Sequence, residues 1–381
     1  MKSTIAFIVR TVLYYFFRIF PVNSKKIFFQ NFNGKGYGDN PKYIVEEILR
    51  RGLDVTLVWS VAREHSGNIP EKIRTVPYKS IKAIYEEVTS KIWIDNCRKQ
   101  LYIKKRKGQY YIQTWHGTVN LKKIEGDVEH KLSEYYVKQA KKDSCLADLF
   151  LSDSTFSSRL YRTSFWYAGE IYETGSPRED ILINYNPDIK SKVRDSFNLS
   201  SDIKILLYAP TFRDNSGIEA YNINFEQILS EIQKQTKEQW VFMIRLHPNI
   251  SKISDFMAYS KYILNASYYD DMQELLIVAD ILITDYSDCM YEFAIMHKPV
   301  FLYASDYEAY IKERDFYFDL FSLPFPCAVN NEELLRNMKQ FNVNQYINNI
   351  DAFFQNVGLI TEGNASKKTV DRIVEIINSN D

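Results

Sequence analysis

The sequence has no excess of either charge and few residues of the kinds that form metal or disulfide sites. Lys+Arg and Asp+Glu each number 48, so the formal net charge is +0 and there is no bulk electrostatic reason to expect nucleic-acid binding. Its four cysteines are widely spaced and form no CxxC pair, which predicts neither a zinc site nor a disulfide framework. We therefore expect no metal site, no cofactor and a reducing, cytoplasmic compartment.

The sequence also lacks an apolar run long enough to cross a bilayer. The stretch Ile5 to Phe20 is shorter than the roughly 20 apolar residues that a spanning helix needs, and no small-residue cleavage site follows it. The segment and its flank carry basic residues: Lys2, Arg10, Arg18, Lys25 and Lys26. Residues 1–25 are therefore predicted to form a helix that lies in the headgroup region of a membrane, with a buried first helix or a true anchor as alternatives.

Length and hydrophobic patterning predict two domains. A chain of 381 residues exceeds one ordinary core and fits two domains of roughly 150–200 residues each. Short apolar strands alternate with helical stretches, beginning with a strand over Lys26–Phe32 and a helix that ends at Gly52. A second such series follows the polar segment Asn184–Asp202, which contains Pro187 and is predicted to link the domains. The fold class is α/β, with two doubly wound Rossmann-like domains and a cleft between them.

These patterns predict four parts of the chain. They are the N-terminal helix (1–25), an N-terminal domain (26–190), a C-terminal domain (200–365) and a final helix (366–381). The sequence does not fix where the final helix packs, and one possible position is back against the N-terminal domain.

Polar side chains follow five of the predicted strands, at the point where each strand ends. Because the carboxyl ends of parallel strands meet at one edge of a sheet, where ligands bind, we expect these side chains to line the cleft. They are His116; Ser152 and Ser154; Arg213 and Asp214; Arg245 and His247; and Asp285, Ser287 and Asp288.

Two histidines stand in short motifs that suit proton transfer and phosphate binding. In WHGT, His116 has a pKa range suited to proton transfer, and Gly117 before Thr118 lets the backbone approach a ligand. In RLHP, His247 is placed to donate to a phosphate oxygen and Arg245 to contact phosphate through its fork. The alternative for each histidine is a structural one that caps a turn or satisfies a strand end.

A strand entering a helix over Thr284–Glu292 predicts a phosphate-binding helix N-terminus. Ser287 adds a hydroxyl and Glu292 is placed near a ribose hydroxyl, while Asp285 suits a turn or cap because a carboxylate repels phosphate. Asp285 is nevertheless counted with this nucleotide site. The alternative is that Asp285 and Ser287 only cap the helix.

Three further features are less specific. Arg213 in APTFRD is the natural second cation for a diphosphate, with a surface ion pair to Asp214 as the alternative. The loop GKGYGD, with Gly34 and Gly36, lacks the third glycine of a dinucleotide fingerprint and weakly predicts an anion or acceptor loop. The run Lys104–Gly108 reads KKRKG and is predicted to be a solvated turn, or else a contact to anionic lipid headgroups.

The motifs occur in an order that resembles a known family. WHGT with LKK after it, SDS, GSPRED, LLYAPTFRD, LHP, ADILITDYSD and RDFYFDL follow one another over about residues 110–320. This series resembles the CDP-glycerol glycerophosphotransferase family of teichoic-acid primases and polymerases. The resemblance implies a GT-B fold, acceptor binding in the N-terminal domain, a CDP donor held mainly by the C-terminal domain, and peripheral attachment at the cytoplasmic face of the cell membrane.

The resemblance also implies roles for individual residues. The family's two motif histidines correspond to His116 and His247, its arginine after APT to Arg213, and its Asp-Tyr-Ser to Asp285, Tyr286 and Ser287. It implies transfer of a polyol phosphate from CDP-glycerol or CDP-ribitol to a lipid-linked saccharide or polyol-phosphate acceptor, with release of CMP. His116 is then the general base, and His247 and Arg213 hold the diphosphate. The expected acceptor-side residues are Gly34, Gly36, Gly117, Thr118 and Ser154.

Departures from the family pattern leave the polyol open. Asp288 replaces a second serine, Glu179 replaces an asparagine, and SLPFPCAV follows RDFYFDL where a Gly-Pro step is usual. Two other functions remain as alternatives: a GT-B glycosyltransferase that uses a nucleotide sugar, and a non-catalytic scaffold of an envelope-synthesis complex. Teichoic acid and capsule are both open as the polymer.

Overall fold

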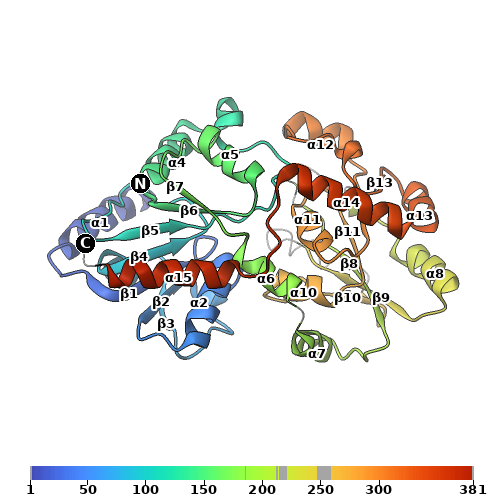
Figure 1. Ribbon diagram of the computed structural model, residues 1–381, viewed down its shortest axis with the longest axis horizontal. Helices are drawn as coiled ribbons and strands as arrows, with labels where there is room; N and C mark the ends of the chain where they lie inside the picture. Colours follow the sequence, from blue (N-terminus) through green and yellow to red (C-terminus); the bar gives the residue numbers. More distant parts are fainter. Residues whose placement is uncertain (1, 185, 212, 214–220, 247–258, 380–381) are drawn as a thin grey trace. The chain divides into compact units, whose positions relative to one another are not determined.

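The computed structural model describes residues 2–184, 186–211, 213, 221–246 and 259–379. The chain forms two compact units, each described here by itself (Figure 1). Unit 1 comprises Met1–Gly117, Ile124–Asp180 and Glu362–Asp381, and unit 2 comprises Thr118–Lys123 and Ile181–Thr361. Each unit is built on its own parallel sheet, as the alternating strand and helix pattern predicts.

Unit 1 contains a seven-stranded sheet in the order β3-β2-β1-β4-β5-β6-β7. Its strands are β1 (Asn23–Gln30), β2 (Thr56–Val61), β3 (Arg74–Pro77), β4 (Ser90–Asp95), β5 (Tyr110–Gln113), β6 (Leu149–Ser152) and β7 (Glu170–Glu173). The paired strands run parallel, and the chain reverses its direction of progress between β1 and β4. In doubly wound sheets, ligands bind near such a reversal, beyond the carboxyl ends of the strands.

Helices cover both faces of this sheet, as a parallel sheet requires. They are α1 (Lys2–Phe17), α2 (Asp39–Arg51), α3 (Ile81–Val88), α4 (Glu134–Leu146), α5 (Thr155–Thr163) and α15 (Ala365–Asn378), with short 3-10 turns at η1 (Arg63–His65), η2 (Glu125–Lys131) and η3 (Pro177–Glu179). Side chains of α2 and α15 share one core cluster, and side chains of α1, α3 and α5 share the other. Gly52 ends α2 in the left-handed conformation, which confirms the predicted C-cap.

The final helix α15 is part of unit 1. Its first backbone N–H groups, at Ala365 and Ser366, donate to the carboxylate of Asp180 at 2.9 and 2.7 Å. Further along, Asp371 forms an ion pair with Arg51 of α2 at 2.6 Å. Figure 1 shows α15 running alongside α2. The end of the chain is therefore packed on the same sheet as its beginning.

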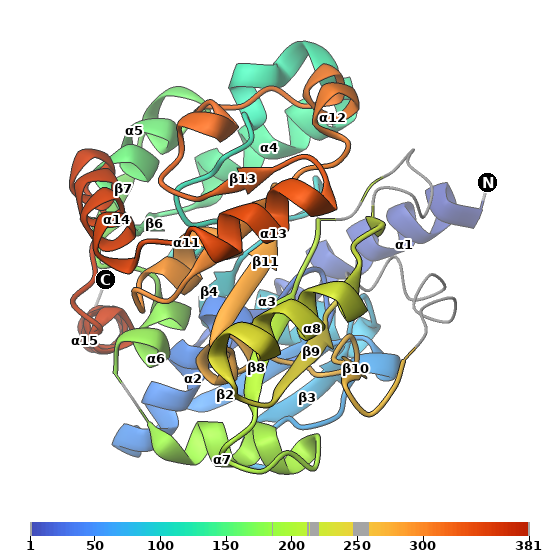
Figure 2. The same ribbon diagram turned by 90° about the vertical axis from the view of Figure 1, so that its right-hand side faces the viewer.

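Unit 2 contains a six-stranded sheet in the order β10-β9-β8-β11-β12-β13. Its strands are β8 (Lys204–Tyr208), β9 (Trp240–Ile244), β10 (Ile263–Asn265), β11 (Ile281–Thr284), β12 (Val300–Tyr303) and β13 (Cys327–Ala328). Its helices are α7 (Pro187–Ser196), α8 (Phe225–Thr236), α10 (Met272–Val278), α11 (Cys289–Ala294), α12 (Tyr307–Glu313), α13 (Asn331–Lys339) and α14 (Val343–Val357), with η6 (Leu320–Ser322); α6 (Asp180–Ile183) lies where the units divide. Figure 2 shows α8 and α13 over one face of this sheet, where their leucines and isoleucines join the core. In this sheet the chain reverses its direction of progress between β8 and β11.

Part of the segment predicted as a link is helical. Helix α7 begins at Pro187, a position where proline is tolerated because the first helical N–H has no partner within the helix. The side chain of Asn186 caps it by accepting from the N–H of Asp188. Lys192 binds Glu274 of α10 at 2.7 Å, so this polar segment is anchored within unit 2.

Helix α1 packs one face on unit 1 and leaves an apolar face in solvent. Tyr14 is fully buried, and its hydroxyl donates to the carbonyl oxygen of Lys104 at 3.0 Å. In the part of the chain that the structure describes, no helix is both long and apolar enough to span a membrane. One residue of the predicted basic flank is placed differently: Lys26 is buried in β1 and forms an ion pair with Glu86 at 2.8 Å, because its strand lies in the sheet.

Candidate functional site

His116 lies in the loop that follows β5, and its ring is held in one orientation. The Nδ1 atom lies 2.6 Å from the carbonyl oxygen of Asn96, which follows the neighbouring strand β4. Because a carbonyl oxygen only accepts, Nδ1 carries the proton and Nε2 of the neutral ring is left as an acceptor. Burial lowers the pKa of His116 from its usual value, partly offset by the charge of Asp39. The ring is therefore neutral near pH 7, as a general base requires.

The backbone on either side of His116 is held by two side chains from distant parts of unit 1. Arg178 donates from Nη1 to the carbonyl oxygen of His116 at 2.8 Å and to the Asp39 carboxylate at 2.6 Å. Asn40 donates from Nδ2 to the carbonyl oxygen of Trp115 at 3.2 Å. Trp115 has a φ of 50°, a strained value for a residue with a side chain. These bonds hold a loop conformation that the chain would not otherwise favour.

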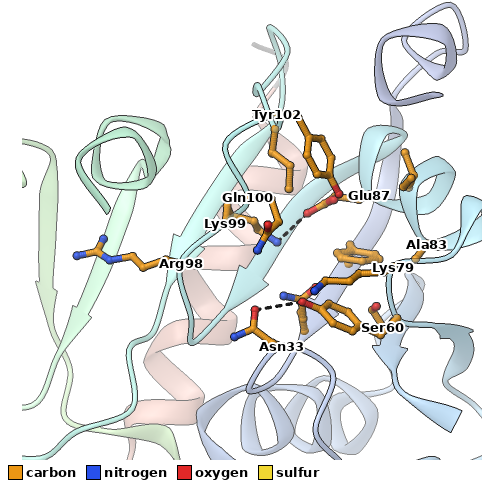
Figure 3. A pocket seen from close by; sticks show the side chains of 14 residues that line it. Asn33, Ser60, Lys79, Ala83, Glu87, Arg98, Lys99, Gln100 and Tyr102 are labelled. Carbon is orange, nitrogen blue, oxygen red and sulfur yellow. Dashed lines mark hydrogen bonds and ion pairs between the residues drawn. The ribbon is translucent and has the colours of Figure 1, made fainter. Parts of the chain in front are cut away.

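A pocket of about 540 Å³ in unit 1 has His116 in its wall. Its other lining residues are Asn33, Tyr78, Lys79, Cys97, Arg98, Gln100, Trp115, Tyr136 and Gln139. A second, much smaller pocket of about 30 Å³ shares Lys79, Arg98 and Gln100 with it, and Figure 3 shows this second pocket from close by. The strand-end histidine is therefore beside a space large enough for a small polar ligand.

In unit 2, Arg213 and Asp285 meet at the reversal between β8 and β11. Arg213 binds Asp285 at 2.6 Å and Asp306 at 2.8 Å, and its guanidinium lies 5.0 Å from the ring centre of Tyr286. Tyr286 in turn donates to Asp306 at 3.0 Å. Only 6% of Arg213 is exposed, so its charge is neutralised inside the protein by two carboxylates. This geometry suits a residue that holds the β8 and β11 loops together.

Arg245 lies at the end of β9, next to β8. Its backbone N–H donates to the carbonyl oxygen of Tyr208 at 2.8 Å, and its guanidinium donates to the carbonyl oxygens of Tyr269 and Asp270, the latter at 3.4 Å. Burial lowers the pKa of Arg245, and the nearby carboxylates of Asp271 and Asp270 oppose that fall. His247, predicted to act with Arg245, and Asp214, the alternative partner of Arg213, lie outside the described residues.

Comparison with known proteins decides the family. The model of the family described as CDP-Glycerol:Poly(glycerophosphate) glycerophosphotransferase matches residues 12–375.

The chain belongs to this family.

Curated relatives in the glycerophosphotransferase family act in teichoic-acid synthesis. A teichoic acid poly(glycerol phosphate) polymerase of Staphylococcus epidermidis is 32% identical, over 92% of this chain and 51% of that protein. A polymerase with the same name from Bacillus spizizenii is 29% identical, over 98% of this chain and 100% of that protein. This chain thus spans about half the length of the first relative and the whole length of the second.

Solved structures confirm the fold class. The wall teichoic acid polymerase TagF superposes with a TM-score of 0.87 and 28% sequence identity, over 98% of this chain and 96% of that one. Another TagF structure, a histidine variant soaked with CDPG, has a TM-score of 0.86 and 29% identity, over 97% of this chain and 94% of that one. The two parallel-sheet α/β units therefore belong to a GT-B-like fold, as the family resemblance implies.

The predicted acceptor-side glycines of this family member shape the loop after β1. Gly34 has a φ of 88°, and a Cβ at this position would lie 2.7 Å from the Tyr78 side chain. Its carbonyl oxygen accepts from the N–H of Ala62 at 2.8 Å. Gly36, with a φ of 77°, accepts from the indole N–H of Trp59 at 3.2 Å. The glycines thus set the turn, and it is their neighbour Asn33 that lines the His116 pocket.

The other acceptor-side residues lie apart from the pocket lining. Ser154 is fully buried and caps α5, accepting from the N–H of Ser157 at 3.0 Å and donating to Asp153 at 2.7 Å. Thr118 is fully buried and begins the short segment assigned to unit 2, directly after Gly117. The hydroxyl of Ser154 is therefore engaged in capping its own helix.

The predicted helix N-terminus in unit 2 belongs to a short helix. Helix α11 has six residues, and the carbonyl oxygen of Ser287 accepts from the N–H of Met290 at 3.1 Å. Asp288, the residue that departs from the family pattern, accepts from the N–H of Leu121 at 3.2 Å. Glu292 is 4% exposed and accepts from Gln273 at 2.6 Å, so one of its oxygens is bound within unit 2.

Proposed function

We propose that this chain transfers a polyol phosphate, glycerol phosphate foremost, from a CDP-polyol to a hydroxyl of a teichoic-acid polymer and releases CMP. The observation that supports it most directly is the neutral His116 ring, fixed through Nδ1 and placed in the wall of a pocket, in a member of the glycerophosphotransferase family. The names of the relatives cover both glycerol-phosphate and ribitol-phosphate polymerases, and a TagF structure was soaked with CDPG.

The chemistry needs one proton transfer and one displacement. Nε2 of His116 takes the proton of the acceptor hydroxyl as its oxygen attacks the β-phosphorus of the donor. A phosphodiester bond forms, the bond between the β-phosphorus and the bridging oxygen breaks, and CMP leaves. Phosphoryl transfer of this kind depends on positioning and on stabilising charge, which we assign to Arg245, Ser287 and His247 on the donor side. Arg213 and Asp285 keep the loops of that side in place.

The first test is CMP release by the purified protein with CDP-glycerol or CDP-ribitol and a lipid-linked saccharide acceptor. We expect acceptor-dependent CMP release with CDP-glycerol, and the better of the two donors identifies the polyol. Nucleoside diphosphate release from a nucleotide sugar would instead support the glycosyltransferase alternative. Ligand binding without turnover of any donor, in a folded protein, would support the scaffold alternative and reject the transferase.

We further propose that the protein attaches peripherally to the cytoplasmic face of the membrane through α1. Large apolar side chains of this helix and its end are exposed: Ile5, Ile8, Val9, Val12, Tyr15, Phe16, Ile19 and Phe20. Basic residues flank them, since Arg18 donates to the carbonyl oxygen of Lys104 at 2.6 Å and so lies beside the KKRKG run. An apolar face bordered by cations suits the interface of an anionic membrane.

Replacing Ile8 and Val12 together by aspartate is expected to weaken binding to phosphatidylglycerol-containing vesicles by at least about tenfold. Burying such a side chain in an apolar phase contributes roughly 1.5–3 kcal/mol, and a carboxylate adds repulsion from anionic lipid. Vesicle sedimentation measures the effect. The control is Val343→Asp, because Val343 is 50% exposed on α14 of unit 2. Equal vesicle binding by the double variant and the wild type would contradict attachment through α1.

A further inference from the structure

The pocket beside His116 contains one cation that the protein leaves without a counter-ion. Lys79 lines the pocket and is exposed, with a φ of 59° and its Nζ 4.9 Å from the ring centre of Tyr78. Gln100, also in the lining, is half-buried. Among the described residues, the Lys79 ammonium has no carboxylate partner and the Gln100 amide has no hydrogen-bond partner. Both groups are therefore free to bind a ligand.

The other cations at this pocket are already neutralised. Arg98 pairs with Glu125 at 3.3 Å and with Asp143 at 3.2 Å. Lys99, in the adjoining small pocket, pairs with Glu87 at 2.8 Å and with Asp95 at 3.0 Å, and Figure 3 shows its bond to Glu87. Arg98 and Lys99 are 5% and 3% exposed. Their charges hold the pocket wall together, which leaves Lys79 as the lining cation with no carboxylate partner in the part of the chain that the structure describes.

A second cation, Arg10, lies on the face of helix α1 that packs beside the small pocket, since the rings of Phe7 and Tyr14 lie 5.6 and 5.8 Å from the ring of Tyr102 in the pocket lining. Arg10 shares a face of α1 with Phe7 and Tyr14, three residues before and four residues after it, and these two side chains pack on the body of unit 1. Its positive charge acts on both Lys79 and Tyr102, two residues that line the small pocket. Burial and the charge of Arg10 together lower the pKa of Lys79. In the described part of the chain, Arg10 also has no carboxylate partner.

The like charges of Arg10 and Lys79 repel each other, and an anion bound by both side chains would remove that repulsion. A phosphate group accepts from an ammonium and from a guanidinium, and it tolerates the partly exposed position of both side chains. The polar side chains of Tyr136, Gln139 and Gln100, which also line the pocket, suit a hydroxyl-bearing chain better than an apolar one.

We propose that Lys79 and Arg10 bind a phosphate group of the acceptor, whose terminal polyol occupies the pocket with its hydroxyl at Nε2 of His116. The proposal rests on the proposed function, because it assigns the acceptor of that same reaction. The outer face of α1 is the apolar one, so a lipid-linked acceptor would pass Arg10 and Lys79 on its way from the membrane to the pocket. The phosphate comes either from a phosphodiester of the polymer or from the diphosphate of its lipid carrier.

Binding measured without turnover tests the proposal independently of the reaction. The probes are tri(glycerol phosphate), uncharged triglycerol, and a disaccharide linked to a short isoprenyl diphosphate, each titrated calorimetrically into the full chain. We expect Lys79→Gln and Arg10→Gln each to weaken binding of the phosphate-bearing probe by about tenfold, the loss of one charge-assisted contact. Weakening of the tri(glycerol phosphate) interaction assigns the polymer phosphodiester, and weakening of the diphosphate probe alone assigns the lipid carrier.

The control is Lys82→Gln, since Lys82 is exposed on α3 three residues after Lys79 and lines neither pocket. Equal effects of Lys82→Gln and Lys79→Gln, or equal binding of tri(glycerol phosphate) and triglycerol, would overturn the proposal. Failure of the proposed function has a different outcome, because the wild type would then bind the probe and release no CMP from either CDP-polyol. The loss of acceptor affinity should also leave the KM for the CDP-polyol unchanged.

Discussion

Replacing His116 by alanine is expected to lower CMP release by about 10²–10⁴-fold, the range that a general base contributes. The reason is geometric: Nδ1 is bound to the carbonyl oxygen of Asn96, so Nε2 is the nitrogen left to take a proton from the acceptor. Alanine removes that acceptor while the Arg178 bond to the carbonyl oxygen of residue 116 can persist. Single-turnover CMP release at saturating donor and acceptor measures the loss directly.

The pH dependence of the wild type gives a second test of the same assignment. A general base must be neutral, so the rate falls as the pH drops through the pKa of His116. Burial lowers that pKa below 6.5, and the acid limb of the profile is therefore expected below pH 6.5. The His116→Ala profile should lack this limb.

A matched control separates lost chemistry from lost folding. His130 is exposed on unit 1 and lines neither pocket, so His130→Ala should keep wild-type turnover. Thermal unfolding should show that His116→Ala remains folded. Turnover close to that of the wild type in a folded His116→Ala protein would remove His116 from the mechanism.

Arg213→Ala is expected to destabilise unit 2 by about 3–5 kcal/mol, the usual cost of removing one partner from a buried ion pair. The substitution leaves Asp285 and Asp306 without the cation that neutralises them, and Asp285 is 1% exposed. The free energy of unfolding from urea titration measures the effect. Because unit 1 has its own core, its unfolding transition should change less.

The stability that Arg213→Ala loses should depend on pH in a defined direction. Burial raises the pKa of Asp306, but the hydrogen bond and charge of Arg213 and the hydrogen bond from Tyr286 lower it, and the net change is a fall. A carboxylate with a lowered pKa in the folded state adds stability above its unfolded pKa of about 3.9 and loses it as the pH falls further. The difference in the free energy of unfolding between the wild type and Arg213→Ala is therefore expected to be largest near pH 7 and to shrink below about pH 4.

Arg336→Ala is the control for Arg213→Ala, because Arg336 is exposed on α13 of the same unit. We expect it to change stability by less than about 0.5 kcal/mol, as surface substitutions usually do. Arg213→Lys keeps the positive charge but cannot form the two-pronged guanidinium hydrogen bonds, so its loss of stability should lie between those of Arg213→Ala and Arg336→Ala. Equal stability of Arg213→Ala and Arg336→Ala would contradict the role that we assign to the ion-pair cluster.

Strands buried on both faces of the sheets could be predicted from the sequence. KIWIDN contains the apolar run Ile92–Ile94 between polar residues and falls in β4, and WVFMI is apolar throughout and forms β9. The edge strand at Arg74–Pro77 could not be predicted, because it is short, ends in proline and is only partly buried. Helix α7 lies in the segment predicted as a link, since a polar surface helix has little apolar periodicity to reveal it.

For the candidate site, motifs located the residues and the tertiary structure decided their partners. WHGT singled out His116, but the sequence offered no sign that the backbone of Asn96 would fix its tautomer. Arg178 was visible within GSPRED as part of the family resemblance and had no assigned role. The ion pair of Arg213 shows the same limit, since the sequence weighed Asp214 as its neighbour and the structure provides Asp285 and Asp306.

The sequence by itself determined the α/β class, the family and the strand ends at which the chemistry-bearing residues lie. These depend on local apolar patterns and on short motifs, which are properties of neighbouring residues. Only the tertiary structure decided that Arg178 holds the His116 loop, that Arg213 is neutralised, and that the charge of Arg10 on α1 acts on Lys79. Each of these interactions joins residues more than 60 positions apart, and the packing of strands and helices, not the order along the chain, brings such residues together.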